Sequence, residues 1–202
     1  IKAMEEARKQ GVRILAFPEL ELTGYTCGDL FLQKTLLDGA LEALQMVLDA
    51  TVGLPMLVFV GLPLQVDGKV YNCAAALSDG EILGIVPKTH LPNYGEFYEK
   101  RQFAPAPEGE PFYVDGFCGQ TVLFGAKQLF WCNEMPELVL GFEICEDLWA
   151  PEAPSVHMAQ AGATVIGNLS ASNEVLGKAD YRRQLVSMQS AKLLCGDRKS
   201  VV

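Results

Sequence analysis

Three short stretches of this chain are largely apolar, and they constrain its fold more than any other feature. They are residues 56–62, 138–144 and 163–169. Continuous apolar runs of this length are typical of strands in a sheet that is covered on both faces. The sequence therefore predicts a buried β-sheet core with helices packed over it.

Amphipathic segments alternate with these strands. Helices are expected over residues 1–10, 30–50, 152–161 and 178–195, because apolar residues recur there three and four positions apart. In the last helix this places Tyr181, Leu185, Met188 and Ala191 on one side. Asp79-Gly80 lies between the apolar runs 70–77 and 81–86 and predicts a β-hairpin. Together these elements indicate one α/β domain with a mixed sheet.

Composition excludes several classes of function. The net charge is −9 with sixteen scattered Lys and Arg, so binding to nucleic acid is not expected. The longest apolar run, residues 54–64, is interrupted by two prolines and is shorter than the roughly 20 residues of a membrane-spanning helix. The six cysteines form no Cys-x-x-Cys pair and have no histidine at metal-ligand spacing. We therefore expect no metal site, no membrane contact, and reduced thiols in a cytoplasmic protein.

Three polar residues each directly follow a predicted strand: Glu19, Lys88 and Cys145. In an open α/β sheet such strand ends form one rim, where ligands bind. Glu146 and Asp147 raise the pKa of a neighbouring thiol, so a reactive Cys145 needs a cation and a base from elsewhere in the chain. Each residue also has an ordinary explanation: a solvated cap, a surface charge and a buried structural cysteine.

The motifs around these residues resemble those of a known superfamily. Phe17-Pro18-Glu19-Leu20, the segment PKTHLP at 87–92 and the segment EICED at 143–147 are similar to the three motifs of the nitrilase, or carbon-nitrogen hydrolase, superfamily. The longer segments LTGYTCGDLF, VPKTHLPNYGEFYEKRQF and EICEDLW resemble the glutaminase domain of the glutamine-dependent NAD synthetases, over residues 2–196. The resemblance implies an αββα sandwich, with Glu19 as general base, Lys88 as oxyanion stabiliser and Cys145 as nucleophile.

The resemblance also implies three substrate-binding residues. Tyr94, Ser172 and Lys178 match the positions that hold glutamine in that family, with Lys178 as the cation for the substrate α-carboxylate. Without the resemblance, loop packing, a strand-end hydrogen bond and a surface charge would explain the same three residues.

The implied reaction is hydrolysis of L-glutamine through a cysteine thioester. The ammonia would serve the ATP-dependent amidation of deamido-NAD by a C-terminal synthetase domain absent from this chain. ATP and magnesium would belong to that domain, so no cofactor is expected here, and the protein is expected to form a homo-oligomer. The alternatives are a stand-alone amidase or nitrilase and a non-catalytic domain that retains the fold.

The two ends of the chain suggest a fragment. The sequence opens with Ile1 inside a predicted helix, so a strand is expected to be missing before it, and further strands after Cys195. We therefore expect a domain over residues 1–196 that is incomplete at both ends, and a ragged end over residues 197–202 with no place in the pattern. Exposed sheet edges would leave such a piece poorly stable and inactive.

Overall fold

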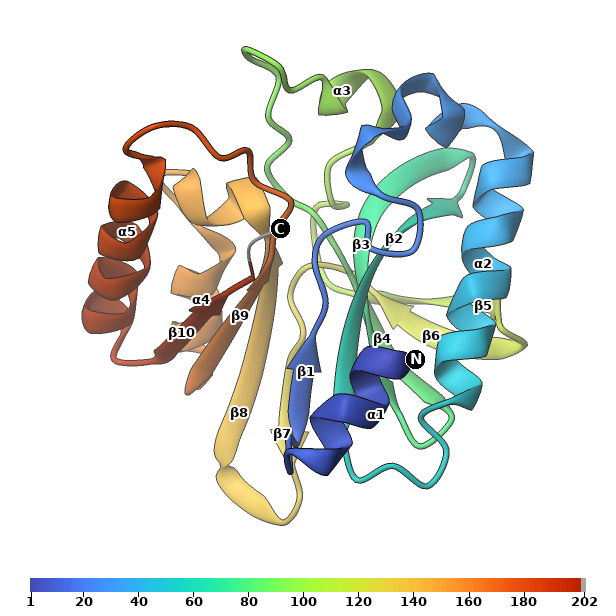
Figure 1. The fold of residues 1–202 in the computed structure, drawn as a ribbon, viewed down its shortest axis with the longest axis horizontal. Coiled ribbons are helices and arrows are strands. Elements are labelled where there is room, and N and C mark those ends of the chain that lie inside the picture. Colours follow the sequence, from blue (N-terminus) through green and yellow to red (C-terminus); the bar gives the residue numbers. More distant parts are fainter. Residues whose placement is uncertain (201–202) are drawn as a thin grey trace.

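Two β-sheets face each other in the computed structural model, which describes residues 1–200 (Figure 1). The first sheet has six strands, in the order β1 (Ile14–Ala16), β2 (Leu57–Val66), β3 (Lys69–Ser78), β4 (Glu81–Pro87), β6 (Gln120–Phe124) and β5 (Phe112–Phe117). The second sheet has four strands, in the order β10 (Gly196–Lys199), β9 (Val165–Leu169), β8 (Met135–Ile144) and β7 (Leu129–Cys132).

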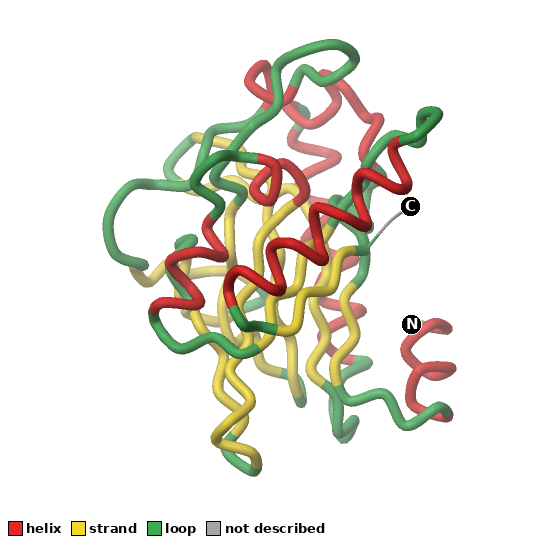
Figure 2. Tube along the Cα trace, turned by 90° about the vertical axis from the view of Figure 1, so that its left-hand side faces the viewer, coloured by secondary structure: helices red, strands yellow, loops and turns green. Residues whose placement is uncertain are grey.

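Helices cover the outer face of each sheet, so the four layers run α, β, β, α. α1 (Lys2–Lys9) and α2 (Lys34–Asp49) lie on the first sheet, while α4 (Pro154–Gln160) and α5 (Lys178–Leu193) lie on the second (Figures 1 and 2). No helix within residues 1–200 has the length and apolar character needed to cross a membrane. The layered arrangement confirms the predicted αββα sandwich.

The space between the sheets is filled by aromatic and small apolar side chains. Phe59 of β2 stacks on Phe142 of β8, and Phe130 of β7 packs edge-on against Phe59. Ala74 and Ala76 of β3 lie in the same buried cluster, where their small size leaves room for the rings. Burial on both faces explains why these strands are continuous apolar runs in the sequence.

Strand directions bring several strand ends to one edge of the sandwich. β1 pairs with β2 in parallel, and the antiparallel pairs β2–β3 and β3–β4 make β4 run in the same direction as β1. β8 and β9 are parallel in the second sheet. The β3–β4 pair confirms the predicted hairpin. The carboxyl ends of β1 and β4, and likewise those of β8 and β9, therefore lie at one edge of their sheet.

Three features differ from the sequence-based expectations. The ragged end predicted for 197–202 was wrong as far as residue 199, because β10 pairs in parallel with β9 through backbone hydrogen bonds that need no apolar side chains. Residues 201–202 lie outside the described part. β5 was not predicted, since its side chains are mostly exposed and show no regular alternation. α2 begins later than expected, after the 3₁₀ segment η1 (Tyr25–Leu32).

The helix predicted over residues 178–195 is confirmed as α5, and its apolar side is largely exposed. Tyr181 and Met188 are 56% and 71% exposed, whereas Arg182 is buried. The Arg182 guanidinium donates hydrogen bonds to the Glu174 carboxylate and the Asn173 carbonyl, so the segment that precedes the helix covers this side. Local polar contacts thus decide which face of α5 is covered.

Candidate active site

A buried ion-pair cluster lies at the rim formed by the strand ends. The Lys88 ammonium, just after β4, contacts one carboxylate oxygen of Glu19 at 2.6 Å and one of Glu99 at 2.7 Å. Glu99 begins the short helix α3 (Glu99–Gln102) and also accepts a hydrogen bond from the Tyr25 hydroxyl at 2.6 Å. The structure therefore brings together two of the three predicted residues and adds a second carboxylate.

Two hydrogen bonds and a close backbone approach fix the position of Glu19. Its Oε1 accepts a hydrogen bond from the Asn72 side-chain amide at 2.7 Å, and its Oε2 accepts one from the Ala171 N–H at 3.0 Å. The segment that carries Glu19 crosses directly over Gly61 of β2, where a Cβ atom would overlap the backbone of Pro18. The absence of a side chain at Gly61 is what allows this close approach.

Cys145 occupies a tight turn at the end of β8. Its φ is +46°, in the left-handed region that non-glycine residues rarely adopt, and it opens the 3₁₀ segment η2 (Cys145–Trp149). The residue is 7% exposed, and its sulfur accepts a hydrogen bond from the Ser170 hydroxyl at 3.2 Å. Strained backbone of this kind is concentrated at functional sites, where surrounding structure holds it in place.

Electrostatics connect the thiol with the ion-pair cluster. Burial and the Glu19 carboxylate raise the pKa of Cys145 to about 11, while the Lys88 ammonium opposes this rise. Burial alone would lower the pKa of Lys88, but Glu19 and Glu99 raise it well above its ordinary value. Lys88 is therefore a permanent cation, and the resting thiol is protonated at neutral pH. A nucleophilic Cys145 needs a base at the moment of attack.

Glu99 is the part of the cluster that the sequence did not single out. Burial raises the pKa of its carboxyl group, an effect that the neighbouring Lys88 ammonium only partly offsets. Burial and Glu99 together raise the pKa of Tyr25 well above its ordinary value, so that the hydroxyl remains a donor. Glu99 lies in the quoted segment VPKTHLPNYGEFYEKRQF, but a carboxylate twelve residues past the end of β4 carries no signal of its own.

The three residues expected to bind substrate lie near the turn that follows Cys145 or in the segment that follows β9. The Tyr94 hydroxyl donates to the Glu146 carboxylate at 2.8 Å. Ser172 is buried two residues beyond Ser170, next to the Ala171 N–H that binds Glu19. The Lys178 ammonium contacts the Asn173 side chain and stands 5.5 Å from the centre of the Trp149 ring.

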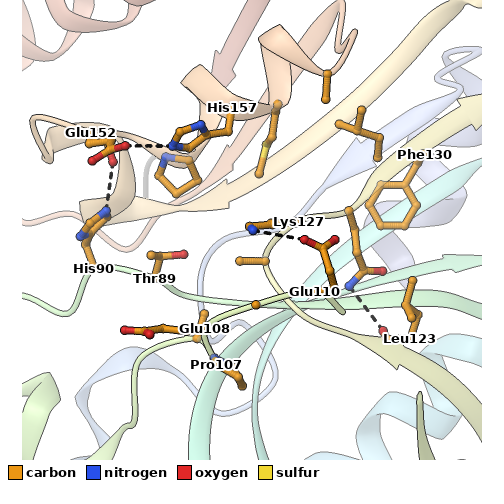
Figure 3. Close-up of a pocket in the computed structure, with 18 of the residues that line it drawn as sticks. Thr89, His90, Pro107, Glu108, Glu110, Leu123, Lys127, Phe130, Glu152 and His157 are labelled. Carbon is orange, nitrogen blue, oxygen red and sulfur yellow. Dashed lines mark hydrogen bonds and ion pairs between the residues drawn. The ribbon is translucent and has the colours of Figure 1, made fainter. Parts of the chain in front are cut away.

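Two cavities border the segment after Lys88. One, of about 670 Å³, is lined by Tyr94, Trp149 and Glu146, the residue that follows Cys145. The other, of about 920 Å³, opens between β7, α4 and the loop at 106–110. At one side of it the His90 ring contacts the backbone carbonyl of Glu152, and the His157 ring contacts the Glu152 carboxylate (Figure 3). None of Glu19, Lys88 and Cys145 lines either cavity. We assign the smaller one to the candidate site because Glu146, which directly follows Cys145, and Tyr94 both line it.

Within residues 1–200 no three His, Cys, Asp or Glu side chains are grouped to hold a metal ion. The cluster of Glu19, Lys88 and Glu99 already contains an internal cation, which occupies the place between the two carboxylates. The arrangement can supply a thiol, a carboxylate base and a fixed positive charge, the components of nucleophilic acyl transfer.

Comparison with known proteins supports the description of the fold as an αββα sandwich. The chain is 44% identical over 185 residues to the glutamine-dependent NAD(+) synthetase of Mycobacterium tuberculosis (strain ATCC 25618 / H37Rv). The aligned stretch covers 91% of this chain but only 27% of that relative. A crystal structure of a glutamine-dependent NAD(+) synthetase from Cytophaga hutchinsonii superposes with a TM-score of 0.87 at 32% identity, over 99% of this chain and 32% of that one. An amidase from Nesterenkonia sp. shares the fold, with a TM-score of 0.71 at 20% identity over 98% of this chain and 67% of that one.

The family itself follows from a match over nearly the whole chain. The sequence pattern of the carbon-nitrogen hydrolases matches residues 1–193. The matched stretch contains the ion-pair cluster, the strained cysteine and all three strand ends described above. The protein therefore belongs to the carbon-nitrogen hydrolase family.

Proposed function

We propose that this chain is a glutaminase unit, which releases ammonia from L-glutamine for a glutamine-dependent NAD synthetase. The observation that carries the proposal is the buried contact of Lys88 with Glu19, set at the same rim as the protonated thiol of Cys145. The names of the relatives support the substrate and the product. The chain spans 27% of the length of the mycobacterial relative, so the activity of a whole synthetase is part of the proposal.

In the first step Glu19 accepts the thiol proton while the sulfur of Cys145 attacks the side-chain amide carbon of glutamine. A C–S bond forms, and the electron pair of the C=O bond moves onto oxygen. Two of the three N–H bonds of Lys88 are already directed at Glu19 and Glu99, which leaves one for this oxyanion. The backbone N–H of Glu146 supplies a second donor, and one such donor contributes about 3 kcal/mol to the transition state.

In the second step the tetrahedral intermediate collapses. The carboxyl group of Glu19 returns its proton to the amide nitrogen, the C–N bond breaks and ammonia leaves, so that a thioester on Cys145 remains. Glu19 then takes a proton from water, the resulting hydroxide attacks the thioester, and glutamate leaves as the thiol is restored. The chain of contacts from Asn72 and Ala171 holds Glu19 in place for both proton transfers.

Substrate binding is proposed for Tyr94, Ser172 and Lys178. The Lys178 ammonium, close to Trp149 and 5.9 Å from the centre of the Phe97 ring, is the cation for the α-carboxylate of glutamine. Tyr94 borders the cavity in which the side-chain amide would pass toward Cys145.

The partner of this unit would be an ATP-dependent synthetase domain that amidates deamido-NAD with the released ammonia. ATP, magnesium and deamido-NAD would bind at that domain, and the proposed hydrolysis of glutamine uses only side chains and water. Assembly into a homo-oligomer and a cytoplasmic location stay predictions.

The test is the replacement Cys145→Ala in the full-length protein. Glutamine-dependent NAD formation and glutamate release should both disappear, whereas NAD formation from added ammonia should persist. The matched control is Cys132→Ala, a thiol on β7 remote from the rim, which should leave both activities unchanged. Glutamate release that survives the Cys145 change would refute the proposal, and hydrolysis of simple amides without glutamine would favour the amidase alternative.

A further inference from the structure

Asp147 is a buried carboxylate in the turn that follows Cys145, and it is 1% exposed. Its Oδ1 accepts the N–H of Thr89 at 3.1 Å and the N–H of His90 at 2.7 Å. Its Oδ2 accepts the N–H of Ile144 at 2.9 Å. One side chain thus joins the segment after β4, in the first sheet, to the end of β8, in the second.

These contacts are immediately adjacent to two residues of the proposed mechanism. Thr89 follows Lys88, and Ile144 precedes Cys145. The backbone of Lys88 is already held within the first sheet, because its N–H donates to the Asn72 carbonyl at 2.8 Å and its carbonyl accepts the Ala106 N–H at 2.8 Å. Cys145 instead sits in a strained turn with φ of +46°. The Ser170 hydroxyl and the Lys199 ammonium also contact Cys145, at its sulfur and its carbonyl, but both come from the second sheet. The Asp147 side chain is what links this turn to the Lys88 segment of the first sheet.

We propose that Asp147 is a positioning residue that holds the Cys145 turn against the Lys88 segment. With the turn in place, the thiol and the Glu146 N–H meet the same substrate carbonyl that Lys88 polarises. The inference rests on the proposed function, since it assigns to Asp147 the alignment of that site's nucleophile and oxyanion donors. A displacement of about 1 Å of such groups can lower a rate about 100-fold.

The chemistry of the contacts explains why a carboxylate is required. Three N–H groups converge on this side chain, two on one oxygen and one on the other. An asparagine would keep one acceptor oxygen for Thr89 and His90 but would turn its NH₂ group toward the Ile144 N–H, where two donors repel. Asp147→Asn therefore releases the Cys145 end of the link while it preserves side-chain size and the contact with the Lys88 segment.

The experiment compares Asp147→Asn and Asp147→Ala with wild type in the full-length protein, by two readouts. The first is kcat and KM for glutamate release. The second is the rate of Cys145 alkylation by iodoacetamide at pH 8, mapped by mass spectrometry. A small alkylating agent needs only the thiol, so it does not require the oxyanion donors. The matched control is Gln128→Ala, a buried side chain that also bonds backbone groups, namely the carbonyls of Ile85 and Gly125, but away from the rim.

If Asp147 positions the turn, kcat falls about 100-fold in both variants at nearly constant KM. Alkylation of Cys145 instead becomes about tenfold faster, because the released thiol is more exposed and more easily ionised. Cys73, fully buried in β3, stays protected and so reports that the fold is intact. The control should show neither effect.

The inference is overturned if kcat or the alkylation rate of Cys145 stays at the wild-type value in Asp147→Asn. It is equally overturned if Cys73 becomes reactive together with Cys145, since that result shows general loosening of the core. A wild-type protein that releases no glutamate contradicts the proposed function instead. In that case the alkylation readout alone decides whether Asp147 holds the turn.

Discussion

The Lys88 ammonium and the Glu19 carboxylate are 2.6 Å apart, and neither side chain has any exposed surface. Their contact joins the end of β4 to the end of β1 across two intervening strands of the first sheet. Because charges in such a position cannot be solvated by water, each depends on the other and on Glu99. This dependence determines how the site should respond to substitution.

Lys88→Met should lower both activity and stability. It leaves Glu19 and Glu99 buried without a cation, and breaking a buried pair by removal of one partner costs about 3–5 kcal/mol. Glutamate release should fall about 1000-fold, because the oxyanion loses a preorganised charge-bearing donor. Thermal unfolding and steady-state kinetics measure the two effects. The control Lys127→Met removes an exposed pair with Glu110 and should change neither, and equal stability of the two variants would contradict the buried-pair argument.

The thiol of Cys145 should show an unusual pH dependence in the absence of substrate. Its pKa is raised to about 11 by burial and by Glu19, so the thiol is protonated at neutral pH and the thiolate fraction grows as pH rises. The alkylation rate of Cys145 should therefore rise about tenfold per pH unit from pH 7 to about pH 10, without a plateau.

Glu19→Gln provides the second half of this pH test. It removes a negative charge beside the thiol, so the pKa of Cys145 should fall and the alkylation curve should move to lower pH. Glutamate release should nevertheless be lost, because the variant has no base. A curve that does not move when Glu19 is neutralised would show that the two groups do not interact.

Gly61→Ala should disturb the site indirectly, through the backbone segment that carries Glu19. A Cβ atom at this position would overlap the backbone at Pro18, Glu19 and Leu20, so the segment must shift and carry the Glu19 carboxylate with it. Overpacking of this kind costs about 1–3 kcal/mol. We expect lower kcat together with a lower melting temperature.

Gly39→Ala is the matched control for this change. Gly39 lies in α2, and a Cβ atom there meets nothing within 4 Å. Alanine should stabilise the helix by up to about 1 kcal/mol and leave kcat unchanged. If Gly61→Ala leaves kcat and the melting temperature as unaffected as this control does, the close approach of the Glu19 segment is not needed for activity.

Lys178→Met should raise the KM for glutamine about tenfold or more with little change in kcat, because an α-carboxylate contact is made equally in the ground state and the transition state. Steady-state glutamate release measures both constants. Lys192→Met, at the exposed last turn of the same helix, serves as the control. A loss confined to kcat would place Lys178 in the chemistry rather than in substrate binding.

Much of the fold could be predicted from local patterns. The hairpin at Asp79-Gly80 and the buried strands β2, β8 and β9 follow from short runs whose period and turn residues are visible in the sequence. β5 and β10 could not be predicted in this way. Both are edge strands held by backbone hydrogen bonds to one neighbour, so their side chains need no apolar pattern.

The candidate site divides in the same way. The sequence by itself determined that Glu19, Lys88 and Cys145 follow strands, because the end of an apolar run is a local property. Only the tertiary structure decided that Glu99 shares Lys88 with Glu19, and that Asp147 links the turn of Cys145 to the segment after Lys88. Those contacts join residues from different strands and sheets, and they depend on how strand direction and sheet packing bring distant segments to one rim.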